Sequence, residues 1–145
     1  MTDPMTPAAP PSCHGLRLLL AKDIDGWVAL SDERVRVEFP YAPPGYPRRL
    51  TGRAELAAYL RDYPAHIDLR DVAYLEIHET ADPTTIVAEW RGTGRVVATG
   101  APYDMTYVVV ATAHDGRFTR YRDYWNPLAI PASMAAEQTT ARSAP

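Results

Sequence analysis

The stretch between Phe118 and Trp125 holds the residues best suited to chemistry. Its side chains alternate with the period of two that predicts a β-strand. One face carries Asp123 between two aromatic neighbours, Tyr121 and Trp125. The other face carries Phe118, Arg120, Arg122 and Tyr124. A carboxylate between aromatic rings loses water, which raises its pKa and suits it to proton transfer. Asp123 is therefore the candidate acid and base of a small-molecule site, with Tyr121 and Trp125 as its walls.

A surface role is the alternative interpretation of Asp123, with its carboxylate paired to Arg120 or Arg122. Adjacent residues on a strand point to opposite faces of the sheet, so pairing within this stretch has poor geometry. We therefore favour the functional interpretation of Asp123.

Two tyrosines and one charged pair are further candidates for the same pocket. Tyr59 and Tyr63 lie on a predicted helix, where they either pack in the core or place their hydroxyls in the pocket. Glu89 and Arg91 share one face of a predicted strand, where they either pair with each other or face the pocket.

Three other features leave their role open. Asp104 lies in phase with Val108 on a strand face that we expect to be concave. The proline-rich loop over residues 40–47 contains Tyr41 and Tyr46, which either rim the pocket or pack on the surface. His66 and His78 have no partner that the sequence identifies.

The elements that must position these residues follow from periodicity. Helices are predicted over residues 16–21, 24–31 and 53–63. Asp23 is placed to cap the second helix, and Pro64 to end the third. Strands are predicted over residues 34–39, 72–79, 85–91, 95–99, 103–112 and 118–125. The 85–91 strand continues into 95–99 through a bulge or relaxed segment at residues 92–94.

This order of elements predicts an α+β fold, in which about three N-terminal helices close a cone-shaped, strongly curved and mostly antiparallel sheet. A cone of this kind can hold a ligand. Its outer face, with Phe118 and Tyr124 among arginines, suits a homodimer contact. The folded domain is expected over residues 13–130, between a disordered arm at 1–12 and a disordered tail at 131–145.

Composition narrows the partners and the compartment. The chain has 145 residues, a net charge of −3 and no basic stripe, which argues against nucleic acid. A single cysteine, Cys13, can form no internal disulfide, and no Cys/His cluster has metal-binding spacing. The longest apolar run is far too short for a membrane span, and no signal peptide is visible. We expect a cytoplasmic protein without a metal or cofactor.

Four segments of the chain resemble the nuclear transport factor 2-like superfamily, and its SnoaL-like branch in particular. They are residues 23–30, 35–40, 51–56 and the pair 115–118 with 124–127. The resemblance covers roughly residues 14–130. It implies the cone fold, but the superfamily hosts isomerases, hydrolases, cyclases, dehydratases and non-enzymes, so it implies no single activity.

Ketosteroid isomerase, one member, keeps an aspartate base just before the proline that ends its first strand. Phe39 holds that position here. Gly15 and Val108 hold the positions of its two oxyanion-binding residues, so its mechanism does not carry over. Trp125 matches an aromatic side chain of its pocket wall, and Phe39 and Val108 become expected pocket-lining residues.

The last predicted strand of this chain resembles the corresponding segment of two other families, limonene epoxide hydrolase and the phenazine-biosynthesis A/B proteins. Residues 122–124 read Arg-Asp-Tyr, like the hydrolase motif whose aspartate activates water. The hydrolase also uses an Arg and an Asp two residues apart, where this chain has Glu89 and Arg91 in reverse order.

In the phenazine proteins the position of Asp123 is a glutamate that moves protons, and a His and a Ser stand where Tyr59 and Tyr63 do. Both resemblances imply an acid at Asp123.

Two functions fit these observations. The first is a cofactor-independent enzyme in which Asp123 moves a proton on a small, largely apolar, cyclic or polyketide-like metabolite. The reaction would be an isomerisation, cyclisation, condensation or epoxide opening. The second is a non-catalytic small-molecule-binding or assembly protein of the same fold.

Overall fold

The computed structural model describes residues 11–129. Its helices are α1 (Pro11–Leu20), α2 (Ile24–Ala29), α3 (Arg53–Leu60), α4 (Tyr63–His66) and the 3-10 turn η1 (Pro127–Ala129). Its strands are β1 (Ser31–Glu38), β2 (Arg49–Thr51), β3 (Ile67–Glu79), β4 (Thr85–Val96), β5 (Pro102–His114) and β6 (Arg117–Trp125). The predicted arm and tail lie outside the described residues, except that residues 11 and 12 belong to α1.

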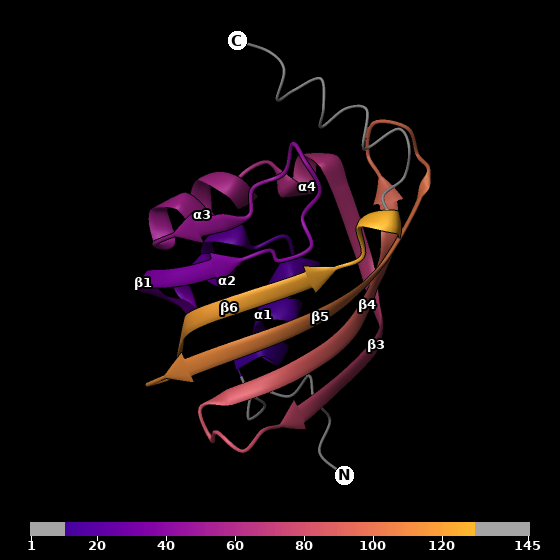
Figure 1. Cartoon of the computed structure of the whole chain (residues 1–145). Coiled ribbons are helices and arrows are strands. Elements are labelled where there is room, and N and C mark those ends of the chain that lie inside the picture. Colours follow the sequence, from indigo (N-terminus) through magenta and orange to yellow (C-terminus); the bar gives the residue numbers. More distant parts are fainter. Residues whose placement is uncertain (1–10, 130–145) are drawn as a thin grey trace.

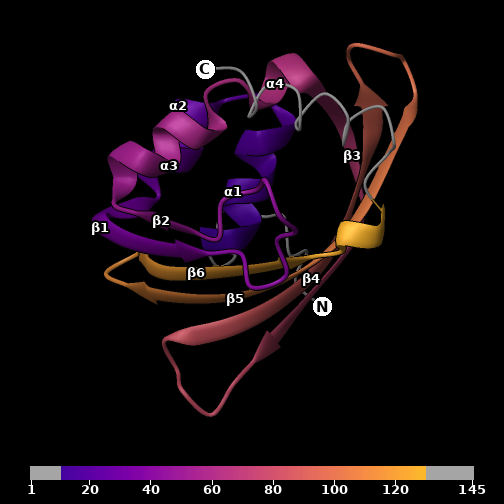
Figure 2. The ribbon, with the colours of Figure 1, turned by 45° about the horizontal axis from the view of Figure 1, so that its top comes forward.

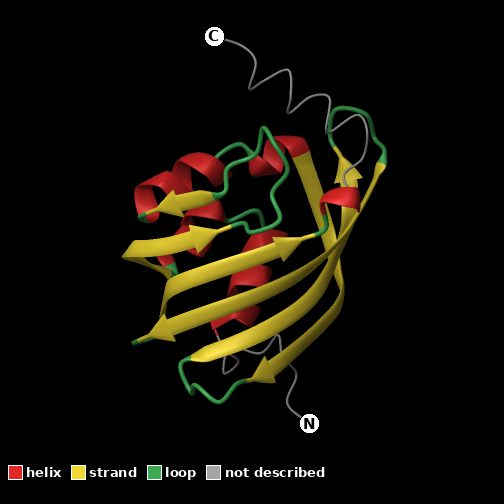
Figure 3. Ribbon diagram, in the orientation of Figure 1, coloured by secondary structure: helices red, strands yellow, loops and turns green. Residues whose placement is uncertain are grey.

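The six strands form one strongly curved sheet in the order β2-β1-β6-β5-β4-β3. Among the strand pairs of residues 11–129, only β1–β6 is parallel. The helices gather on one side of the sheet, inside its curve (Figures 1 and 2). Figure 3 shows this arrangement of helices over strands by type of element. The predicted α+β class and the mostly antiparallel curved sheet are confirmed, although β2 and β3 remain as edges and the sheet does not close on itself.

The core lies between these helices and the inner face of the sheet. Trp27 and Val28 of α2 and Leu56 of α3 are buried against strand residues such as Val35 and Val37. Asp23 caps α2 as predicted, because its carboxylate accepts a hydrogen bond of 2.9 Å from the Gly26 N–H.

The helix predicted over residues 53–63 is confirmed as far as Leu60 and is wrong beyond it. It ends at Leu60, and a separate short helix, α4, begins at Tyr63. Pro64 occupies the first turn of α4, where a missing N–H costs nothing, so the proline starts a helix here. The short strand β2 was also not predicted, since three residues carry no periodic signal.

The predicted position of Phe118 on the outer face is wrong as well. The β5–β6 register shifts between Thr112 and Ala113, where Thr112 pairs with Arg120 and Ala113 with Phe118. This bulge adds one residue to β6 and reverses the alternation before it. Phe118 is therefore buried and packs against Tyr121, with ring centroids 5.4 Å apart.

No helix in the described range is long and apolar enough to cross a membrane.

Candidate functional site

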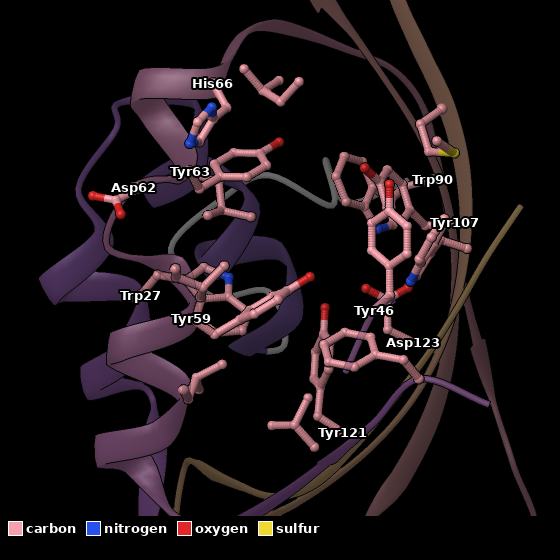
Figure 4. A pocket seen from close by; sticks show the side chains of 18 of the residues that line it. Trp27, Tyr46, Tyr59, Asp62, Tyr63, His66, Trp90, Tyr107, Tyr121 and Asp123 are labelled. Carbon is pink, nitrogen blue, oxygen red and sulfur yellow. The ribbon is translucent and has the colours of Figure 1, made fainter. Parts of the chain in front are cut away.

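A cavity of about 390 Å³ lies between the helices and the inner face of the sheet. Figure 4 shows Tyr59 and Tyr63 reaching into it from the helical side, and Asp123 and Tyr121 from the side of the sheet. This volume falls within the range of small-molecule sites, and most of the lining is aromatic or aliphatic.

Asp123 is the acidic group of the sheet side of this cavity. The β5–β6 pairing sets it opposite Val109, which is fully buried on the inner face. The carboxylate atom Oδ1 of Asp123 is buried and has no hydrogen-bond partner among the described residues. Burial alone raises the pKa of Asp123 from 3.8 to about 7. Near neutral pH this carboxyl is therefore present both as an acid and as a base, as proton transfer requires.

Aromatic rings hold the walls around Asp123 in place. Tyr121 meets Trp27 edge to face, with ring centroids 5.6 Å apart. Trp125 meets Tyr46 in the same way at 5.4 Å. Such contacts fix ring orientation and exclude water from the carboxylate between them.

A second aromatic layer faces these walls. Phe39 packs against Tyr59 with ring centroids 5.4 Å apart. Trp90 stacks on Tyr107 at 4.2 Å and an interplanar angle of 13°. These contacts give the cavity a largely aromatic lining.

Tyrosine hydroxyls supply further polar groups. Tyr103 hydrogen-bonds both to Tyr107 and to Tyr63. Burial, and to a smaller extent the charge of Asp123, raises the pKa of Tyr121 and of all three linked tyrosines, that of Tyr103 to about 12. These hydroxyls therefore remain protonated at neutral pH and can donate hydrogen bonds.

The cavity brings together six residues singled out in the sequence, namely Asp123, Tyr121, Trp125, Tyr59, Tyr63 and Phe39. The two tyrosines of the loop over residues 40–47 lie in different places. Tyr46 lines the cavity, while Tyr41 is exposed and packs against Tyr124 on the outside. His66 also lines the cavity.

Val108, Glu89 and Arg91 do not reach the cavity, so their predicted position was wrong. Val108 pairs with Tyr124 and Glu89 pairs with Val108 across the sheet, which places all of them on the outer face. The two charged residues also do not pair with each other.

Arg91 and Glu89 each bond a different residue on that outer face. Arg91 donates two hydrogen bonds to Asp104, of 2.8 and 2.6 Å. Glu89 bonds His78 at 2.8 Å.

The sequence contained the signal that would have corrected this error. On β5, the positions Tyr103, Met105 and Tyr107 carry larger apolar side chains than the positions between them. The side with the larger apolar groups is the buried one, and Trp90 marks the same side of β4. Phase assigned from side-chain size would have found Tyr103, Tyr107 and Trp90, which the sequence analysis missed.

A possible metal-binding cluster lies away from the cavity. Glu76, His78 and Glu89 place one ligand atom each within 4.8 Å of one another, on the outer face of β3 and β4. The register between strands creates this group, so spacing along the sequence did not reveal it. The His78–Glu89 contact already satisfies these side chains without an ion.

Comparison with known proteins assigns the family. Residues 15–121 match the SnoaL-like domain. The chain belongs to the SnoaL-like family. The matched region includes Tyr121 and ends two residues before Asp123, so the family assignment rests on the scaffold and not on that carboxylate.

Two relatives extend over most of the chain. The protein YesE of Bacillus subtilis is 42% identical over 123 residues, which cover 82% of this chain and 84% of YesE. A PhzA/B-like protein of Pseudomonas aeruginosa is 36% identical over 129 residues, which cover 89% of this chain and 91% of that protein. The resemblance to the phenazine-biosynthesis A/B group is therefore confirmed at the level of sequence.

Solved structures show the same fold. A Bacillus subtilis protein provisionally named an isomerase matches with a TM-score of 0.80 and 40% identity, over 87% of this chain and 93% of that one. A Mycobacterium tuberculosis protein in complex with estradiol-17β-hemisuccinate matches with a TM-score of 0.70 and 22% identity, over 82% and 91% of the two chains. The second likeness shows the fold alone.

Proposed function

We propose that this protein is an acid–base enzyme that needs no cofactor and acts on a small, largely apolar metabolite. The observation that carries the proposal is the buried Oδ1 of Asp123, a carboxylate atom that has no hydrogen-bond partner within residues 11–129 and stands at the wall of a cavity lined by aromatic residues. A buried polar atom without a partner costs stability, so its retention points to a role with a ligand.

In this proposal Asp123 removes a proton from a bound substrate and returns it at another atom. Isomerisation and cyclisation of a cyclic or polyketide-like compound fit best, because both need one base that becomes an acid. Condensation and epoxide opening use the same carboxyl. The isomerase name of the Bacillus subtilis structure supports the first of these.

The flat apolar walls select the substrate. Trp90, Tyr107 and Phe39 offer ring faces that favour a fused-ring or conjugated compound over an open polar one. Tyr59 and Tyr63 then bind the polar substituents of that compound through their hydroxyls.

Proton exchange with solvent tests this function directly. A panel of cyclic ketones and 1,3-diketones is incubated with the protein in heavy water, and loss of the proton signal next to the carbonyl is followed by NMR. We expect exchange that falls about a hundred- to ten-thousand-fold in the Asp123→Asn variant. The Asp71→Asn variant, at an exposed aspartate of β3, is the matched control. Full exchange by Asp123→Asn would contradict the proposal.

A binding protein without catalysis is the second candidate. It is favoured by the Mycobacterium tuberculosis neighbour, which holds an estradiol derivative in the same fold. In that case ring compounds bind the wild-type protein and its Asp123→Asn variant, but no compound of the panel exchanges protons faster than it does without protein.

We further propose that two copies of the chain pair through the outer face of the sheet. Val108 and Tyr124 give this face an apolar centre, and the Nε atom of Arg122 is buried without a partner among the described residues. A carboxylate such as Glu89 of a second copy would satisfy that donor.

A charge at the centre of the outer face tests this pairing. Val108→Glu should convert a dimer to a monomer in sedimentation experiments, because it buries an unpaired charge. Val97→Glu, at a position that is 52% exposed and follows β4, is the control and should leave the dimer intact. A wild-type protein that sediments as a monomer would exclude this contact.

A further inference from the structure

Two carboxylates face each other on the outer face of the sheet, away from the cavity. Glu76 of β3 lies directly opposite Glu89 of β4 in the strand register. Like charges at directly opposed positions destabilise a sheet, so a cation between them would relieve the repulsion. Among the described residues, neither glutamate forms a salt bridge with a lysine or an arginine. Arg91 shares this face of β4, but two hydrogen bonds hold it to Asp104.

A histidine lies between the two carboxylates. His78 follows Glu76 on the same face of β3. Its Nε2 atom is 2.8 Å from Oε2 of Glu89 and 3.9 Å from Oε1 of Glu76. A carboxylate only accepts, so Nε2 donates its proton to Glu89, and the longer distance is no hydrogen bond. The imidazole therefore satisfies Glu89 and leaves Oε1 of Glu76 outside the contact.

The spacing of these three ligand atoms suits a metal ion. All of them lie within 4.8 Å of one another. Zinc holds nitrogen and oxygen ligands in a tetrahedron at about 2.0–2.2 Å, which sets neighbouring ligand atoms roughly 3.3–3.6 Å apart. The two distances from His78 Nε2, 2.8 and 3.9 Å, lie on either side of this value. The three side chains are about half exposed, so small rotations of the glutamates can complete the geometry.

A tyrosine orients one of these ligands from outside the group. The hydroxyl of Tyr74 donates a hydrogen bond to Oε2 of Glu76. The other oxygen of that carboxylate, Oε1, is the one nearest to His78. Carboxylates that bind metals are held by outer hydrogen bonds of this kind, which fix the oxygen that faces the ion.

We propose that Glu76, His78 and Glu89 bind one zinc ion per chain, with water as the fourth ligand. Zinc would take the place of the Nε2 proton and reach both carboxylates, where the proton reaches one. An imidazole nitrogen in the ligand set favours zinc over magnesium and calcium, which prefer oxygen ligands alone. The ion would fasten the edge strand β3 to β4, and it has no part in the proposed chemistry of the cavity.

The place of the site on the sheet makes its stoichiometry informative. Glu89 also lies directly opposite Val108, the centre of the proposed contact between two copies. Three ligands from one chain require one zinc ion per chain. An ion shared between two copies would instead give one zinc ion for every two chains.

The test is a zinc titration of the untagged full chain in competition with a chromophoric zinc chelator. Loss of an outer partner typically weakens metal binding about 10–100-fold, and loss of a ligand costs more. Glu76→Gln, Glu89→Gln and His78→Ala should therefore each weaken zinc binding by about a hundredfold or more. Tyr74→Phe, which removes only the outer hydrogen bond, should weaken it by about tenfold.

Two matched variants and a second metal serve as controls. Glu79→Gln changes an exposed glutamate at the end of β3, and His114→Gln changes an exposed histidine at the end of β5. Both should bind zinc as the wild type does. Magnesium at the same concentration should not displace the ion, because it binds imidazole poorly.

Three results would overturn this site. They are a wild-type protein that binds no zinc, a zinc affinity that His78→Ala or Glu89→Gln leaves unchanged, and a stoichiometry of half an ion per chain. An affinity that survives His78→Ala would reduce the site to a pair of surface carboxylates. The readout is the metal itself, so it stands or falls independently of proton exchange in the cavity.

Discussion

Replacing Asp123 by asparagine should stabilise the protein at neutral and alkaline pH. The pKa of Asp123 rises from 3.8 to about 7 because burial disfavours its charge. Each pH unit of difference corresponds to about 1.4 kcal/mol, so ionising this carboxyl in the folded state costs about 4 kcal/mol. That is a large share of the 5–15 kcal/mol by which domains are typically stable.

The sign of the effect follows from proton binding. Between the unfolded pKa of 3.8 and the folded pKa of about 7, the folded state holds the proton more tightly than the unfolded chain. The contribution of Asp123 to stability therefore falls as pH rises through this window and is constant above it. Asparagine cannot ionise, so the variant lacks this loss.

The assay is urea unfolding followed by tryptophan fluorescence, for the wild type and for Asp123→Asn. Other groups also titrate, so the quantity of interest is the difference between the two proteins. The advantage of the variant should grow by about 3 kcal/mol between about pH 5 and about pH 8. Asp71→Asn, at an exposed aspartate of β3, is the matched control. A difference that stays constant across this range would refute the burial argument for Asp123.

Three further substitutions test the scaffold, each by the free energy of unfolding. Gly94→Ala should destabilise the protein by about 2–4 kcal/mol, because the new Cβ would lie 1.9 Å from the Asp68 carbonyl oxygen on the neighbouring strand. An unchanged stability would mean that β3 and β4 do not approach each other this closely. Leu56→Ala should cost about 2–5 kcal/mol and enlarge the cavity, since Leu56 is 2% exposed and lines it, and a smaller loss would indicate that the site collapses. Asp23→Ala should cost about 1 kcal/mol by removing the cap of α2, whereas Asp23→Asn, which keeps an acceptor, should cost less.

The sequence predicted the fold well wherever one periodicity ran without interruption. The face that joins Tyr121, Asp123 and Trp125 was predicted from alternation alone, and β6 keeps that alternation over these residues. The prediction from alternation failed at Phe118, because a bulge depends on how β6 pairs with β5 and cannot be recognised in the sequence pattern of β6 alone.

The predicted position of Val108 in the cavity was wrong for another reason. The concave face of β5 was assigned from the ketosteroid isomerase resemblance, whereas the larger side chains of Tyr103 and Tyr107 mark the opposite face as buried. Local residue size was the better guide here, because burial of apolar area decides which face of a strand turns inward.

The link from Tyr63 to Tyr103 was beyond any local pattern. These residues stand on α4 and β5, and their hydroxyls meet only because the sheet curves around the helices (Figure 2). The candidate base was therefore predictable from the sequence, whereas the contact between the Tyr63 and Tyr103 hydroxyls at the same cavity was not.

The most direct test of the account is the titration of Asp123 itself. Carboxyl carbons of aspartate are labelled with carbon-13, the Asp123 signal is assigned by its loss in Asp123→Asn, and its chemical shift is followed against pH by NMR. We expect a midpoint of about 7. A midpoint near the ordinary aspartate value of about 3.9 would contradict it, since Asp123 would then be a solvated carboxylate and not the acid and base of this cavity.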